Sequence, residues 1–168
     1  FMNKIKNKQF LETEFANNFA SPYFPVLAEL YLKEGDLRRA KLVCETGLEH
    51  DSENDCGKFI LAQIALSENK LVIAEKYLKE AISINPSNFN AIRMLLKVEQ
   101  SLNRSINTIN KYANQILQYI PDDLECNDLL SKNEKNTAKS KEPIATKSKN
   151  IKPKITKKIN KIKTPQIN

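Results

Sequence analysis

The chain of 168 residues has no tryptophan, one histidine, three cysteines and three glycines. A single histidine, His50, provides neither a Cys/His cluster for a metal ion nor a Ser–His–acid set for nucleophilic catalysis. The glycines Gly35, Gly47 and Gly57 are isolated, so no glycine-rich loop can cradle a phosphate. We therefore predict no catalytic residue, no metal site and no cofactor, and we do not expect an enzyme.

The cysteine content and the absence of long apolar runs indicate which cellular compartment to expect for the protein. The three cysteines, Cys44, Cys56 and Cys126, are odd in number and form no C-x-x-C pair, which suits a reducing compartment. Cys44 and Cys126 fall where a small apolar side chain packs, so core packing is favoured over redox chemistry. No run approaches the ~18 apolar residues that cross a bilayer, and no signal-peptide core follows Met2–Lys8. We expect a cytoplasmic protein without a transmembrane segment.

Charge is distributed unevenly along the chain. Residues 132–168 contain 12 lysines against Glu134 and Glu142, a net charge of +10. Residues 1–131 contain 15 Lys and Arg against 18 Asp and Glu, a net charge of −3. The basic character therefore belongs to the C-terminal region, and binding to a polyanion should be sought there.

What the sequence does contain is a repeat with a period of 34 residues. Five apolar residues of one copy recur in the next: Ala28, Tyr31, Ala40, Cys44 and Leu48 correspond to Ala62, Ala65, Ala74, Leu78 and Ile82. A period of that length, with small residues at fixed offsets, is typical of stacked helical hairpins. The sequence thus predicts an all-α fold. The predicted segments are a lead-in helix over 2–20, hairpins over 21–54, 55–88 and 89–122, a capping helix over 123–131, and a disordered Lys-rich tail over 132–168.

The hairpin boundaries follow from turn and cap residues. Ser21 is expected to cap the first helix, with Pro22 at the first helical position, where its missing N–H costs nothing. Gly35, Asn69 and Asn103 are expected in the turns inside the three hairpins.

The third copy is the least regular. Its proline, Pro121, arrives one residue late, while Thr108 and Tyr112 fit the small-then-large pattern without a shift. We therefore place the extra residue near the end of that hairpin's second helix. Asp122 or Asp123 then caps the last helix, which holds Leu124, Leu129 and Leu130 and covers the end of the array.

These positions resemble the tetratricopeptide repeat (TPR) family over about residues 21–131. The matching residues of the first two copies are Phe24, Leu27, Ala28, Tyr31, Ala40, Cys44 and Gly47, then Leu61, Ala62, Ala65, Ala74, Leu78, Ala81 and Pro86. The third copy matches less well, through Ile92, Leu95, Leu96, Thr108 and Tyr112. The resemblance implies a right-handed α-solenoid of about three hairpins.

The resemblance also implies a protein-binding scaffold or adaptor whose concave face is lined by the first helix of each hairpin. On this chain the candidate partner-binding residues are Glu29, Leu32, Phe59, Gln63, Leu66, Arg93, Lys97 and Gln100. Some TPR domains grip a chaperone's C-terminal carboxylate with Lys and Asn, but Pro25 and Glu29 occupy the first-repeat positions here. A peptide with an acidic group near Arg93 and Lys97 fits this pattern, although Phe59 and Leu66 are equally compatible with simple packing.

The tail offers a second attachment point. After Pro153, Ile155, Ile159 and Ile162 recur at the spacing of an amphipathic helix, among Lys154, Lys157, Lys158, Lys161 and Lys163. Three interpretations remain open: non-specific binding of nucleic-acid phosphates, docking on an anionic membrane surface, or a solvated extension that binds nothing. The tail has no arginine and no aromatic residue, which argues against sequence-specific readout of bases.

Overall fold

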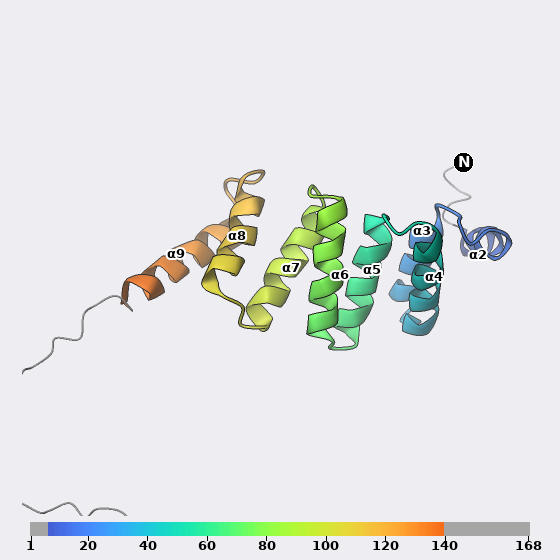
Figure 1. Cartoon of the computed structure of the whole chain (residues 1–168), viewed down its shortest axis with the longest axis horizontal. Coiled ribbons are helices and arrows are strands. Elements are labelled where there is room, and N and C mark those ends of the chain that lie inside the picture. The colour runs from blue at the N-terminus through green and yellow to red at the C-terminus, as the bar shows by residue number, and fades with distance from the viewer. Residues whose placement is uncertain (1–6, 140–168) are drawn as a thin grey trace, which may run out of the picture.

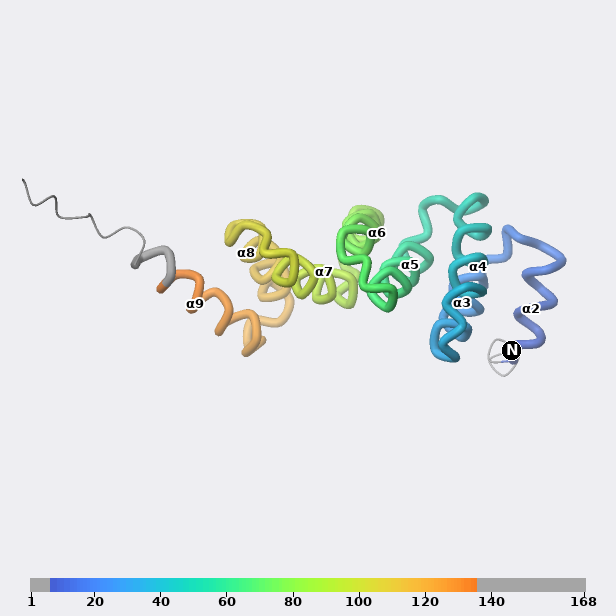
Figure 2. The backbone as a smooth tube through the Cα atoms, turned by 90° about the horizontal axis from the view of Figure 1, so that it is seen from below, coloured from blue at the N-terminus to red at the C-terminus, as the bar shows by residue number. Residues whose placement is uncertain are grey.

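The computed structural model describes the backbone of residues 7–139 and the side chains of residues 7–135. Within that range the chain forms helices and no strand, in the order α2 (Lys8–Asn17), α3 (Phe24–Lys33), α4 (Leu37–His50), α5 (Asp55–Ser67), α6 (Leu71–Ile84), α7 (Phe89–Ser101), α8 (Ile106–Leu117) and α9 (Leu124–Lys139). The helices follow one another along a single long axis, with α2 at one end and α9 at the other (Figures 1 and 2). The predicted all-α solenoid is confirmed.

Three antiparallel pairs, α3/α4, α5/α6 and α7/α8, form the array, and each helix also packs on the next one along the chain. The helices α3 and α5 are in direct contact as well. The turn inside each hairpin contains a residue with a left-handed backbone: Gly35 (φ 79°), Asn69 (φ 57°) and Asn103 (φ 51°). These three residues are spaced 34 apart, and Gly and Asn are the residues that adopt this conformation most readily. The repeat therefore includes the turn as well as the apolar pattern.

The first hairpin begins later than predicted. The helix α3 starts at Phe24, and Ser21 does not cap it. Instead the Ser21 backbone N–H donates to the Asn18 carbonyl (2.9 Å), within a tight turn that leads into the helix. Pro25 rather than Pro22 occupies the first turn of α3. The start is explained by Phe24, which is only 1% exposed and anchors the beginning of the helix in the core.

The prediction for the extra residue of the third hairpin was wrong. The helix α8 begins at Ile106, 35 residues after α6 begins at Leu71, so the insertion lies in the turn that precedes α8. The Ser105 hydroxyl in that turn accepts a hydrogen bond from the Thr108 backbone N–H (3.2 Å) and caps α8. As a result Ile109 takes the inward position that was expected for Thr108. The Thr108 side chain is only partly buried.

The core consists of two clusters of buried side chains, one around α2–α5 and one around α5–α9, with Tyr77 packed against both. Phe24 fills the centre of the first cluster. A Cβ atom added at Gly47 would lie 2.3 Å from the Phe24 ring, and one added at Gly57 would lie 2.8 Å from it. Both glycines are therefore needed because the ring occupies the space of their missing side chains.

The last helix differs from the prediction in length and orientation. Asp123 caps it by accepting from the Cys126 backbone N–H (2.9 Å), as one of the two alternatives predicted. Leu124, expected to pack inward, is 80% exposed, and Cys126 is the fully buried residue of that turn. The helix continues to Lys139 instead of ending at residue 131. Asn133 in this extension donates to the Asn110 side chain of α8 (2.6 Å), so polar contacts prolong the helix beyond its last leucine.

Candidate binding groove

Two neighbouring hollows lie where α3 faces α5. The first, of about 240 Å³, is lined by Pro25, Val26, Glu29, Cys56, Phe59, Ile60 and Gln63. The second, of about 450 Å³, is lined by Glu29, Leu32, Lys33, Gln63, Leu66, Ser67 and Met94. Glu29 and Gln63 border both hollows, so the two together form one groove, named here the α3/α5 groove. Five of the eight predicted residues therefore come together in it: Glu29, Leu32, Phe59, Gln63 and Leu66.

The remaining predicted residues lie on α7, outside these two hollows. Arg93 is held by ion pairs with Asp123 (2.6 Å) and Glu125 (3.5 Å). The side-chain hydrogen bond from Arg93 and the backbone N–H of Cys126 lower the pKa of Asp123 to about 2. Of the two cations predicted at one end of the groove, Arg93 and Lys97, Lys97 therefore remains available to a partner, and it is exposed. The Gln100 side chain is partly buried. The sequence pattern could not reveal this, because the carboxylates come from a helix about 30 residues further along the chain.

Met94 also lines the second hollow, at a position that the repeat pattern does not assign to the groove. It follows Arg93 by one residue, so α7 presents this neighbouring position to the groove. Val26 likewise lines the first hollow, beside the predicted Pro25 position. Both residues enlarge the apolar part of the groove. In both cases the feature of the sequence that could have indicated them was an apolar side chain next to a predicted position.

The polar groups of the groove are nearly neutral in sum. Glu29 forms an ion pair with Lys33 (2.7 Å), and both side chains are at least half exposed. The Ser67 hydroxyl donates to the Gln63 backbone carbonyl (3.0 Å). The Gln63 side-chain amide, in contrast, has no hydrogen-bond partner among the residues that the structure describes. It is partly buried between the two hollows, and it can both donate and accept.

Of the three cysteines, Cys56 lines this groove, and burial, with a smaller contribution from Asp55, raises the pKa of its thiol. The other two cysteines and the histidine lie outside it. Burial, with a smaller contribution from Glu45, raises the pKa of the Cys44 thiol to about 12, so the thiol stays protonated and packs as a small apolar group. Burial also raises the pKa of Cys126, to about 11. His50 is exposed at the end of α4. Between residues 7 and 135, no group of three or more His, Cys, Asp or Glu side chains could hold a metal ion.

Two further findings concern attachment and membranes. The predicted polyanion-binding lysines, Lys154, Lys157, Lys158, Lys161 and Lys163, lie outside the described residues. None of the helices in the described part of the chain combines the length and the apolar character needed to cross a bilayer.

No protein-family model and no curated protein sequence matches the chain. Several solved structures do. YrrB, a TPR protein with an unusual peptide-binding site, is similar at a TM-score of 0.69 and 16% identity, over 79% of this chain and 69% of that one. The first TPR of Spaghetti (RPAP3) bound to HSP90 peptide SRMEEVD is similar at a TM-score of 0.57 and 20% identity, over 68% of this chain and 93% of that one. The second TPR domain of human RPAP3, in complex with HSP70 peptide SGPTIEEVD, is similar at a TM-score of 0.54 and 23% identity, over 64% of this chain and 88% of that one. At these identities the likeness establishes the fold.

Proposed function

The chain folds as an array of tetratricopeptide hairpins, and we propose that it is a non-enzymatic scaffold that binds a peptide segment of a partner protein in the α3/α5 groove. The observation that carries the proposal is the Gln63 amide, which lies between the two hollows of the groove without a hydrogen-bond partner among the described residues. The two RPAP3 structures with bound HSP90 and HSP70 peptides support a peptide as the ligand class.

An extended peptide suits the groove because its side chains and its backbone need different partners. Side chains that point to the same face of an extended chain are about 7 Å apart, a distance that two neighbouring hollows can accommodate. Phe59 and Ile60 offer apolar contact in the first hollow, and Leu66 and Met94 offer it in the second. The Gln63 amide can then bond to the backbone N–H and C=O of the segment between them.

The groove favours an apolar segment over a carboxylate. The charges of Glu29 and Lys33 offset each other in the groove, and Pro25 cannot donate from its side chain or its backbone nitrogen. Lys97 on α7 is the cation available for an acidic group beyond Met94, because Arg93 is engaged by Asp123 and Lys33 is paired with Glu29. The partner segment is therefore proposed to carry two apolar anchors, with any acidic residue on the α7 side.

A displayed library of random peptides, selected on the full chain, tests the proposal. Selected peptides are expected to share two apolar anchors separated by one residue. In the variant Gln63→Trp the larger side chain fills both hollows and removes the amide, so binding should weaken by about tenfold or more. The affinities are measured by fluorescence anisotropy with labelled peptides.

The matched control is Gln118→Trp, which introduces the same side chain at an exposed position at the end of α8. This variant should bind the selected peptides as the unmodified chain does. Thermal melts of both variants show whether each is folded. Peptides that bind the folded Gln63→Trp variant with unchanged affinity would contradict the assignment of the groove.

A further inference from the structure

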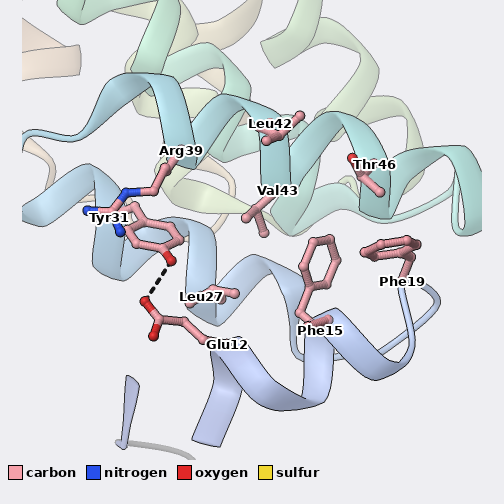
Figure 3. Close-up of a pocket in the computed structure, with 10 residues that line it drawn as sticks. Glu12, Phe15, Phe19, Leu27, Tyr31, Arg39, Leu42, Val43 and Thr46 are labelled. Atoms are coloured by element: carbon pink, nitrogen blue, oxygen red, sulfur yellow. Dashed lines mark hydrogen bonds between the residues drawn. The ribbon is translucent and has the colours of Figure 1, made fainter. Parts of the chain in front are cut away.

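A third hollow, of about 430 Å³, lies at the other side of the first hairpin, between α2 and α4; it is named here the α2/α4 groove. Leu27 and Tyr31 of α3 form its floor, Phe15 comes from α2 and Phe19 from the turn that follows it, and Leu42, Val43 and Thr46 come from α4 (Figure 3). At one end the Tyr31 hydroxyl donates to Glu12 (2.7 Å), and the Arg39 guanidinium lies 4.5 Å from the centre of the Tyr31 ring.

The walls of this groove expose large apolar side chains to solvent. Leu42 is 62% exposed and Phe19 is 49% exposed, on opposite sides of the hollow. Phe15 and Phe19 stack edge to face, with ring centres 5.4 Å apart, so this wall is held in place. An apolar hollow between two helices has the shape that takes the apolar face of a third helix.

We propose that the α2/α4 groove binds residues 154–163 of a second copy of this chain, with Ile155, Ile159 and Ile162 in the hollow. These three isoleucines recur at i, i+4 and i+7, and so would share one face of a helix about 10 Å long. Pro153 precedes the segment and suits the start of a helix. The segment lies outside the described residues, and the proposal concerns the state it adopts when it is bound.

Charge complementarity favours this occupant. The segment carries five lysines and no acidic residue, whereas residues 1–131 have a net charge of −3. Two cations lie over the Tyr31 ring at one end of the groove, and both are already paired, Arg39 with Asp36 (2.6 Å) and Lys8 with Glu34. Glu49 lies one turn beyond Thr46 on α4 and has no ion pair among the described residues. A basic helix with its isoleucines in the hollow would thus place lysines beside Glu49 and the partly buried Glu12.

The distance along the chain favours a second copy over the same copy. The helix α9 ends at Lys139, at the opposite end of the array from α2. The 16 residue steps from Lys139 to Ile155 span at most about 55 Å when fully extended. The linker would have to run back along almost the whole array to reach its own α2/α4 groove. The groove of another copy requires no such extension, and this mode joins chains end to end.

Photo-crosslinking in the full chain tests the proposal. Ile159 is replaced by p-benzoyl-phenylalanine, which keeps the position apolar, and this probe chain is mixed with an excess of isotope-labelled full chain. We expect crosslinks between one probe chain and one labelled chain, located by mass spectrometry in α2 and α4. Introducing Leu42→Asp into the labelled chain should reduce these crosslinks about tenfold, because it places a charge in the apolar hollow.

The matched control is Val72→Asp in the labelled chain, since Val72 on α6 is also 62% exposed. This variant should leave the crosslinks unchanged. Both substitutions are at exposed positions, and melting curves verify that each variant folds. Because neither position lines the α3/α5 groove, affinity for selected peptides should be unaffected in both variants, which separates this proposal from the proposed function.

Three results would overturn the proposal. Crosslinks found only within one chain would exclude a second copy as the source of the segment. Crosslinks spread over the whole surface, or unaffected by Leu42→Asp, would exclude the α2/α4 groove as the site. Co-sedimentation of the full chain with phosphatidylserine vesicles, undiminished by Leu42→Asp and without crosslinks in α2 or α4, would identify the segment as a membrane-surface element instead.

Discussion

The two ends of the array close the same kind of helical seam by different means. In the N-terminal cluster, around α2–α5, the Phe24 ring occupies the space that Gly47 and Gly57 leave open. In the C-terminal cluster, around α5–α9, two carboxylates are buried among apolar residues, Glu75 at 6% and Glu99 at 0% exposure. The same repeat pattern therefore allows two ways of packing the seam between helices. In shape closure an aromatic ring fills the space left by glycines, and in charge closure buried carboxylates are paired with cations.

The charged closure depends on two cations. The Lys79 ammonium is hydrogen-bonded to Glu75 and lies 2.9 Å from Glu99 Oε1. That second contact is an ion pair without aligned hydrogen bonds, since neither Glu99 oxygen has a hydrogen-bond partner. Arg104, in the turn before α8, donates to Glu75 (2.6 Å). Burial acts to raise the pKa of Glu75, but the hydrogen bonds from Arg104 and Lys79 outweigh it and lower that pKa.

The comparison teaches where each end is vulnerable. Shape closure fails when a side chain grows, because the ring and the added atom cannot share one space. Charge closure fails when one partner is removed, because a buried charge then remains without compensation.

Removal of Lys79 should have the largest effect. Lys79→Met keeps most of the side-chain volume and leaves Glu75 and Glu99 facing each other, so we expect a loss of about 3 kcal/mol in the free energy of unfolding. This is the lower end for a buried pair, since the Lys79 side chain is 44% exposed. Urea denaturation measures it. Lys76→Met, on the same helix but 72% exposed and 3.9 Å from Glu80, is the control and should cost less than about 1 kcal/mol.

Enlargement of Gly47 should come next. In most helices Gly→Ala is stabilising, but at this position the new Cβ would meet the Phe24 ring at 2.3 Å. Gly47→Ala should therefore destabilise the chain by about 2–3 kcal/mol, measured by the same denaturation. Combining it with Phe24→Leu should recover part of that loss. If Gly47→Ala alone increased the free energy of unfolding, the Phe24 ring would not be packed tightly against Gly47.

The seam between the two clusters offers a smaller test. Ala74 on α6 is fully buried, whereas Lys70 just before α6 is exposed. Ala74→Leu should overpack the seam by about 1–2 kcal/mol, and Lys70→Leu should have little effect on stability. Calorimetry of both variants gives the comparison. Equal melting temperatures would argue against close packing at this small-residue position.

The smallest effect concerns the cap of α9. Asp123 has a pKa lowered from 3.8 to about 2, by Arg93 and the Cys126 backbone N–H. A folded-state pKa below the unfolded value stabilises the fold above about pH 4, and this contribution is lost as the pH falls toward 2. Asp123→Asn keeps a capping side chain but removes the charge. It should cost less than about 1 kcal/mol at pH 7, because Arg93 is partly exposed. The difference from the unmodified chain should vanish near pH 2; a constant difference would contradict the assignment.

The period of 34 residues was sufficient to predict the all-α solenoid, because the turn residues and most of the buried seam residues follow it. Its failures occurred where an inserted residue or a capping side chain shifts the register of a helix. Thr108 fitted the local pattern, yet an insertion before α8 gave its inward place to Ile109. Leu124 was apolar, but the Asp123 cap fixed a register in which Cys126 points inward.

The candidate site was predictable to a similar extent. Positions on α3 and α5 follow from the repeat, and they line the α3/α5 groove together. Arg93 was expected to be available because its partners, Asp123 and Glu125, are distant in sequence. The α2/α4 groove was also missed, since the lead-in helix lies outside the repeat and its packing has no counterpart in the periodic pattern.

The most direct test of the central claim, that a peptide binds between α3 and α5, is a titration of the full chain with a selected peptide, followed by NMR of backbone and side-chain amides. We expect the largest shift changes in residues 25–33 and 56–67 and on the Gln63 side-chain amide. Shift changes confined to α4, α6 or α8, with the Gln63 amide unmoved, would contradict it.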